Sequence, residues 1–535
     1  MKFTDLGSHK RLTELAKNPP DLTRASFLTP ERIDKMAVEA LSWKMLYATE
    51  AVDSEVEKAL VRLSREANVL EKMAFLQEMQ VMNYVNNCES EERRVGHTAI
   101  RALEVSPYAS KELTAAVDAA KSEMVKLEAF LPKVDKFKAM VVVGIGGSYL
   151  GTKAVLEALK AYQQNGRKLY FASNVDPDKI QSILQEVELA TTLIVIVSKS
   201  GGTLEIAAQE EVLRRSYAKE KLDVKNHFVM ITTQKSPMDT PSAYLETFYL
   251  WDYIGGRYSV SSMVGAVPIS FMLGLSIWKE FLRGLHEMDL HARYETDPKK
   301  NLPLWGALLG VWNHNFLKRG TFAIIPYAQG MYAWTEHLQQ LFMESNGKSV
   351  SQKDGSFIDW QTAPVLWGTV GTEGQHSYYQ AIHQGTQVVP VEFVGFLESQ
   401  FGLDDEIEGT TNQEKLLANL FAQSLALAKG QKDVNHNRYF SGSRPNHILL
   451  ANRLDAYTLG NLLAYYEHYV AFQGFLWNIN SFDQEGVQLG KRLANDFLEL
   501  IKELHHDKPS KEPVKDRMLV HAFLQNLKNY TTKKS

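Results

Sequence analysis

The chain has 535 residues, of which 59 are basic and 63 acidic, so its formal net charge is −4. This near-neutral balance argues against a nucleic-acid or anionic-membrane partner, because such partners select a basic surplus. An apolar content of 44% indicates a folded protein with a large core, and the length allows about three domains. The single cysteine, Cys88, excludes an intrachain disulfide, and Met1–Leu6 lacks the apolar core of a secretory signal. We therefore expect a cytoplasmic protein.

Helical spacing dominates the first part of the chain, and the strand signal starts near Phe137. Helices are expected first over Val56–Ala67, Leu70–Tyr84 and Ser110–Leu127. Short apolar runs then predict strands over Met140–Val143, Leu169–Ala172, Leu193–Val197 and Phe228–Thr232. The amphipathic stretches between them predict helices over Gly151–Gln163, Pro177–Leu189 and Thr203–Lys219.

The uncharged stretch Ser259–Trp278 is long enough to cross a bilayer. It nevertheless contains five serines, two glycines and Pro268, and charged residues crowd both of its flanks. This composition favours a buried helix behind a functional loop, so we expect no membrane span.

A second series of strands and helices follows a polar break near Tyr294–Asn301. Strands are expected over Thr321–Pro326, Ala363–Trp367, Val388–Val394 and Ile448–Ala451, and helices over Asn412–Lys429 and Tyr457–Phe472. Continuous apolar strands that alternate with helices indicate parallel sheets covered on both faces. The sequence therefore predicts an α/β fold with two doubly wound parallel-sheet domains, 136–295 and 296–504. A mainly helical extension, 1–135, precedes them, and an arm, 505–535, follows.

The glycine-rich loop Gly144–Gly151 follows the first predicted strand, where open parallel sheets bind ligands. It does not fit a dinucleotide-binding fingerprint, because the third glycine position of that pattern falls on Tyr149. It does not fit a P-loop either, because Thr152 separates Gly151 from Lys153. Nicotinamide and ATP sites are therefore disfavoured, and we expect no cofactor.

A second loop, Ser198–Glu205, follows the predicted strand Leu193–Val197. Its hydroxyls, its two adjacent glycines and the helix that begins after it suit a phosphate dianion. The alternative is an ordinary helix start with Thr203 as the N-cap. The additional serines and glycines, which a simple cap does not need, favour a phosphate site.

Both loops and four further segments resemble the phosphoglucose isomerase family. The four segments are Asp252–Ser259, Met343–Lys348, Gly371–Gln380 and Ser481–Lys491. Ser90–Arg93 and Ser443–Pro445 are also similar to family positions, and the matches run in the family's order. Departures are small: Tyr149 stands where many members carry Asp, and Val370 and Glu373 where Pro and Asn are frequent.

The resemblance implies two flavodoxin-like sugar-isomerase domains and the reversible conversion of glucose 6-phosphate to fructose 6-phosphate. Ring opening and proton transfer through a cis-enediolate would need no metal, and no clustered metal-ligand spacing is visible in the sequence. By the same resemblance, Glu344 is the proton-transfer base and Arg257, which stays protonated, stabilises the enediolate. His376 and Lys491 are the ring-opening pair.

The remaining site residues are assigned by resemblance as well. Ser198, Lys199 (through its backbone), Ser200 and Thr203 hold the phosphate; Gly147 and Ser148 line the sugar; Gln484 positions the substrate. The family's equivalent of His376 reaches into the neighbouring subunit's site, which implies a homodimer here. Two alternatives stay open: an isomerase for another sugar phosphate, such as mannose 6-phosphate, and a phosphosugar-binding regulatory module. The retained residues Glu344, Arg257, His376 and Lys491 argue against a module without catalysis.

Overall fold

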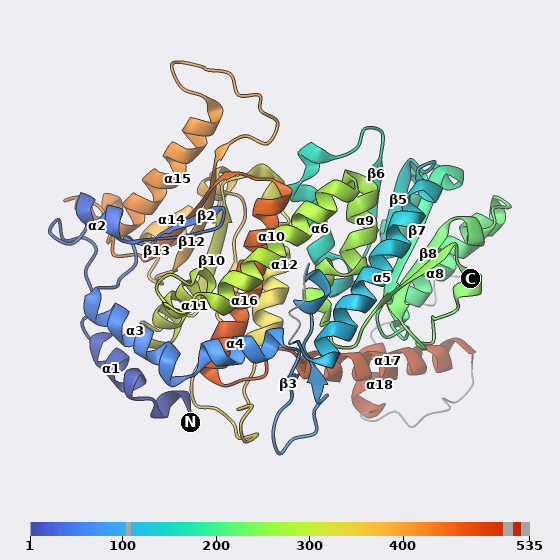
Figure 1. Ribbon diagram of the computed structural model, residues 1–535, viewed down its shortest axis with the longest axis horizontal. Coiled ribbons are helices and arrows are strands. Elements are labelled where there is room, and N and C mark those ends of the chain that lie inside the picture. Colours follow the sequence, from blue (N-terminus) through green and yellow to red (C-terminus); the bar gives the residue numbers. More distant parts are fainter. Residues whose placement is uncertain (1, 103–108, 507–516, 526–535) are drawn as a thin grey trace. The chain divides into compact units, whose positions relative to one another are not determined.

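The computed structural model describes residues 2–102, 109–506 and 517–525 (Figure 1). It forms two compact units, Met1–Phe482 and Asp483–Ser535. The first unit contains both main sheets, and the second contains the last two helices.

The first sheet has five parallel strands in the order β6-β5-β7-β8-β9. Their bounds are β5 (Ala139–Val143), β6 (Lys168–Ala172), β7 (Thr192–Ser198), β8 (Phe228–Thr233) and β9 (Glu246–Leu250). This is the flavodoxin-like winding, in which the strand order reverses between β5 and β7. The loops that follow these two strands are the two glycine-rich loops, so both lie at the switch point where such sheets bind ligands.

The second sheet has the order β1-β2-β13-β12-β10-β11. Its strands are β1 (Ala37–Ala40), β2 (Trp43–Leu46), β10 (Thr321–Pro326), β11 (Val365–Trp367), β12 (Val391–Glu398) and β13 (Asn446–Arg453). The last four are parallel and repeat the winding of the first sheet, whereas β2 pairs antiparallel with both β1 and β13. The predicted α/β class with two doubly wound parallel sheets is therefore confirmed.

The N-terminal segment differs from the expected run of helices. The hairpin β1–β2 turns at Leu41, which has a left-handed φ of 56°, and it adds two strands to the second sheet. The helix expected over Leu70–Tyr84 ends at Gln77. A short antiparallel pair, β3 (Val81–Asn83) and β4 (Arg93–Arg94), follows it. The domain boundaries at residues 135, 295 and 504 stay predictions.

Helices cover both faces of each sheet. In the first unit they are α1 (Gly7–Leu15), α2 (Pro30–Lys35), α3 (Ser54–Glu66), α4 (Val69–Gln77), α5 (Lys111–Val134), α6 (Leu150–Ala158), α7 (Pro177–Glu186), α8 (Leu204–Lys219), α9 (Met263–Leu273), α10 (Leu275–Tyr294), α11 (Leu302–Val311), α12 (Trp334–Gln339), α13 (Gly371–Gln375), α14 (Tyr379–Gln384), α15 (Asn412–Lys429) and α16 (Ala456–Trp477).

Alternate residues of each strand enter different cores. Val141 and Ile194 pack against α7 and α8, whereas Val142 and Val195 belong to a large core that also contains α9 and α16. That large core reaches the second sheet as well, through residues such as Ile324. Helices α10 and α16 pack along one another and lie between the two sheets (Figure 1).

The uncharged stretch Ser259–Trp278 forms a turn, the helix α9 and the start of α10. Every residue of α9 is buried within the first unit. Among the helices that the structure describes, none combines the length and the apolar character needed to cross a membrane.

The second unit contains α17 (Gln488–His506) and α18 (Arg517–Gln525). Leu500 of α17 packs against Val520 and Leu524 of α18. Most of the predicted arm, 505–535, lies outside the described residues.

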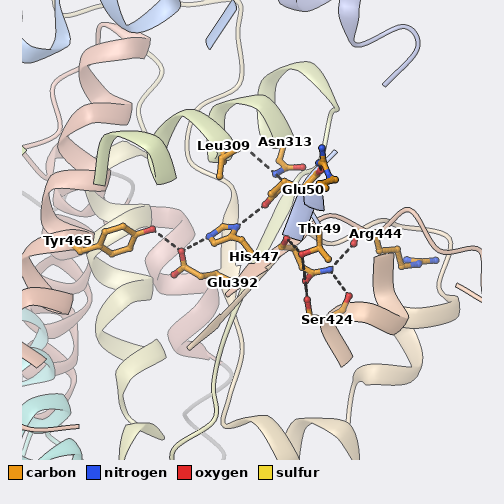
Figure 2. A network of polar contacts seen from close by, with 11 residues as sticks. Thr49, Glu50, Leu309, Asn313, Glu392, Ser424, Arg444, His447 and Tyr465 are labelled. Carbon is orange, nitrogen blue, oxygen red and sulfur yellow. Dashed lines mark hydrogen bonds and ion pairs between the residues drawn. The ribbon is translucent and has the colours of Figure 1, made fainter. Parts of the chain in front are cut away.

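A buried histidine joins the N-terminal segment to the second sheet (Figure 2). The Nδ1 atom of His447, on β13, lies 2.8 Å from Oε1 of Glu50, and its Nε2 atom lies 2.7 Å from Oε2 of Glu392 on β12. Tyr465 donates a hydrogen bond to Glu392, and Asn313 donates one to Glu50. Burial alone would lower the pKa of His447, but its hydrogen bonds and charge attraction to the two carboxylates raise it to about 9.

The charged form of His447 should therefore stabilise the fold in a pH-dependent way. Its contribution is complete below the ordinary histidine pKa of 6.5 and is lost as pH rises through about 9. We expect the stability difference between wild type and His447→Gln to shrink by on the order of 3 kcal/mol between about pH 6 and pH 10. Denaturant unfolding of both proteins across this range measures it, and a difference that is constant with pH would contradict the charged bridge.

Candidate active site

The loop after β5 is pressed against the loop that carries Arg257. A Cβ atom built on Gly147 would lie 2.2 Å from the carbonyl carbon and oxygen of Gly256 and 2.7 Å from the amide nitrogen of Arg257. Ser259 also donates a hydrogen bond from its hydroxyl to the Gly147 carbonyl, at 3.2 Å. Only glycine permits this approach, so Gly147 sets the distance between the two loops.

The loop after β7 has the features of an anion site. Gly201 has a left-handed φ of 64°, and Ser200 accepts a hydrogen bond from the amide of Gly202. Within the described part of the chain, the buried hydroxyl of Ser198 has no hydrogen-bond partner. Thr203 occupies the N-cap position of α8, but its side chain makes no capping hydrogen bond. These two hydroxyls are therefore not used to hold the loop itself.

Lys199 is held by the protein backbone. Its Nζ atom donates to the carbonyl oxygens of Asp252, at 3.0 Å, and Ile254, at 2.8 Å. Burial lowers the pKa of this ammonium group. The side chain thus connects the β7 loop to the segment before Arg257.

Arg257 is a buried cation whose three nitrogen positions all have acceptors. Its Nη1 atom lies 2.8 Å from Oε1 of Glu344, its Nε donates to Oγ of Ser345 at 2.6 Å, and its Nη2 donates to the carbonyl oxygen of Ser481 at 2.6 Å. The arginine side chain is 0% exposed, whereas the Glu344 side chain is 25% exposed. The pair therefore combines a fixed, desolvated cation with a carboxylate that solvent or a ligand can reach.

Glu344 ends a π-helical turn, Gln340–Glu344, that continues α12. Such turns occur often at functional sites. Gln340 donates to Oε2 of Glu344 at 3.0 Å, and Lys348 donates to the backbone carbonyl of Glu344 at 2.6 Å. Each carboxylate oxygen of Glu344 therefore has its own donor, which fixes the orientation of the group.

The contacts described above do not include His376, and two further predicted site residues belong to the second unit. His376 follows α13 and is exposed, and no hydrogen bond or ion pair joins its side chain to Arg257 or Glu344 among the described residues. Gln484 and Lys491 belong to the second unit, where Lys491 is in the first turn of α17. The roles of these three residues stay predictions. Gly147 contacts the backbone of Gly256 and Arg257, and Arg257 contacts Glu344, so these predicted site residues are brought together directly.

Sequence reasoning missed three residues that support the Arg257–Glu344 pair: Gln340, Ser345 and Tyr258. The signal for Gln340 is its place four residues before Glu344, one helical turn away. Ser345 and Tyr258 are direct neighbours of predicted site residues, but the contacts of Ser345 with Arg257 and Tyr258 join residues that are 88 and 87 positions apart in the sequence. No local pattern reveals such a contact.

Within the described ranges, no three His, Cys, Asp or Glu side chains gather into a group that could hold a metal ion.

We expect Gly147→Ala to destabilise the protein, because its methyl group would overlap the Gly256 backbone. The free energy of unfolding should fall by roughly 2 kcal/mol or more. Gly320→Ala is the matched control, since a Cβ there meets no atom within 4 Å, and it should change stability by no more than about 1 kcal/mol. Denaturant titration compares the two variants, and equal stabilities would show that the loops need not approach so closely.

Comparison with known proteins shows the family to which the chain belongs. The family model for phosphoglucose isomerase matches residues 46–512. A glucose-6-phosphate isomerase of Protochlamydia amoebophila is 49% identical over 524 residues, which cover 97% of each chain. One from Chlamydia caviae is 47% identical over 94% of this chain and 95% of its own. A crystal structure of a glucose-6-phosphate isomerase from Chlamydia trachomatis superposes with a TM-score of 0.94 at 44% identity, covering 98% of this chain and all of that one. The chain belongs to the phosphoglucose isomerase family.

Proposed function

We propose that the protein interconverts glucose 6-phosphate and fructose 6-phosphate, a step of glycolysis and gluconeogenesis. The observation that carries this proposal is the contact between the buried Arg257 and the partly exposed Glu344, next to the glycine-rich loop that contains Gly147. Family membership over residues 46–512 and the names of the relatives support the same reaction.

In the proposed mechanism, Glu344 removes the proton from C2 of the open-chain aldose and returns it to C1. The negative charge that develops on the enediolate oxygens lies near Arg257, whose guanidinium stays protonated throughout. Since Gln340 and Arg257 hold the two carboxylate oxygens, Glu344 approaches the substrate in one orientation. The reaction uses no metal and no cofactor.

The other predicted residues are assigned to the phosphate, to the sugar and to ring opening. The phosphate is held by Ser198, Ser200, Thr203 and the Lys199 backbone, and this is supported by the unused hydroxyls of Ser198 and Thr203. Gly147 and Ser148 line the sugar, and Gln484 positions the substrate near the phosphate. His376 and Lys491 exchange protons with the ring oxygen and its hydroxyl during ring opening.

We also propose that the working form is a cytoplasmic homodimer in which His376 completes the neighbouring subunit's site. The exposure of His376, and its lack of a bond to Arg257 or Glu344 among the described residues, support a role outside its own chain's catalytic pair. Residues 136–295 and 296–504 would form the two sugar-isomerase domains of each subunit.

A coupled assay of the purified protein with several hexose phosphates tests the proposed reaction. Fructose 6-phosphate should be converted to glucose 6-phosphate, and mannose 6-phosphate should be a much poorer substrate. The variant Glu344→Gln should bind substrate but lose roughly 10³-fold or more in turnover, because it lacks the proton-transfer base. Preference for mannose 6-phosphate would reassign the substrate. Binding without turnover in the wild type would instead indicate a regulatory module.

Mixing two inactive variants tests the shared site. Glu344→Gln and His376→Ala should each be inactive alone, since each removes one group from both sites of its dimer. After co-expression, half of randomly assorted dimers are mixed and each mixed dimer has one intact site, so about a quarter of wild-type activity should return. Recovery of no activity would place His376 in the site of its own chain.

A further inference from the structure

The planar guanidinium of Arg257 is held at all three nitrogen positions, and only one of them, Nη1, contacts Glu344. Because the group is rigid, fixing Nε and Nη2 determines where Nη1 points. The acceptor at Nη2 is a backbone carbonyl, that of Ser481, whereas the acceptor at Nε is the side-chain hydroxyl of Ser345. The contact at Nε is therefore one that substitution of a side chain can remove.

Ser345 directly follows Glu344 and is 0% exposed. Its Oγ atom accepts from Arg257 at 2.6 Å and lies 3.0 Å from the hydroxyl of Tyr258. Without the hydroxyl, the Nε–H of a buried cation would lose its acceptor, and water could not replace it at a position closed to solvent. The guanidinium would then shift toward other acceptors.

Tyr258 contacts the same hydroxyl of Ser345 that accepts from Arg257. It is 1% exposed, and its ring stacks on that of His97, with centroids 4.6 Å apart and planes 23° apart. Burial raises the pKa of Tyr258, so its phenol stays protonated and can hydrogen-bond to Ser345 at neutral pH. The Tyr258 hydroxyl thus has a fixed position from which to orient the serine.

We propose that Ser345 is a positioning residue that, together with Tyr258, directs Nη1 of Arg257 toward Glu344 and the developing enediolate. This proposal rests on the proposed function, because it concerns how Arg257 meets charge that exists only during the reaction. Binding of the ground-state sugar phosphate does not depend on that charge. Loss of the Ser345 hydroxyl should therefore affect kcat and leave KM nearly unchanged.

The test is steady-state kinetics of Ser345→Ala with fructose 6-phosphate as the substrate. We expect kcat to fall roughly 10- to 100-fold, with KM within about 2-fold of wild type. The matched control is Ser351→Ala, which removes another buried hydroxyl that accepts from a side chain, Nδ2 of Asn478. In the described part of the chain, no hydrogen bond joins Ser351 to Arg257. Its kcat should stay at the wild-type value. A merely structural hydroxyl would lower the melting temperature in Ser345→Ala and leave kcat unchanged, and that result would overturn the proposal.

Tyr258→Phe provides an independent arm if Ser345→Ala does not fold. It removes only the hydroxyl and should lower kcat about 2- to 5-fold at constant KM, the size expected for one hydrogen bond. A wild-type kcat in a folded Tyr258→Phe, with Ser345→Ala unfolded, would also overturn the proposal. Failure of the proposed function itself is distinguishable, because the wild type would then show no isomerisation at all.

Discussion

The candidate site depends on the burial of the Arg257 guanidinium and on the contacts that compensate for it. Placing a cation where solvent cannot reach it is costly unless charge and hydrogen bonds compensate for lost hydration. Here Glu344, Ser345 and the Ser481 carbonyl provide that compensation. Three segments that lie far apart in the sequence must therefore meet around one side chain. Because Gly256 precedes the arginine and touches Gly147, the loop after β5 is fixed by the same arrangement.

The winding of the sheets explains why the loops meet at this place. In each sheet the strand order reverses beside its first parallel strand, β5 in one and β10 in the other. The loops after β5 and β7 emerge at such a point, and the segment after β10 leads through α12 to Glu344. A single large core connects the two sheets. The fold therefore delivers the glycine-rich loops from one sheet and the carboxylate from the other.

Much of the fold could be predicted because buried parallel strands are continuous apolar runs. The strand Thr321–Pro326 and the helix Asn412–Lys429 have the expected bounds. The hairpin β1–β2 was missed because its turn has Leu41 in a left-handed conformation, where a sequence signal would be glycine or asparagine. The helix expected through Tyr84 was too long because Met79 is also left-handed. Neither leucine nor methionine is a residue type that predicts a left-handed conformation.

For the site, the motifs select candidate residues but do not show how those residues are held. Arg257 and Glu344 were both selected from the sequence, but their mutual contact and its support by Ser345 are tertiary. The N-cap alternative for Thr203 shows the opposite case. Its position at the start of α8 was predicted correctly, yet its hydroxyl does not cap the helix. Residue type alone could not distinguish a threonine whose hydroxyl caps a helix from one whose hydroxyl does not.

The most direct test of the account is deuterium exchange at C2 of glucose 6-phosphate in D₂O, followed by NMR for the wild type and for Glu344→Gln. If Glu344, held by Arg257, moves the proton, the wild type should incorporate solvent deuterium at C2 and the variant should incorporate almost none. Exchange at the wild-type rate in Glu344→Gln would contradict the assignment of Glu344 as the base.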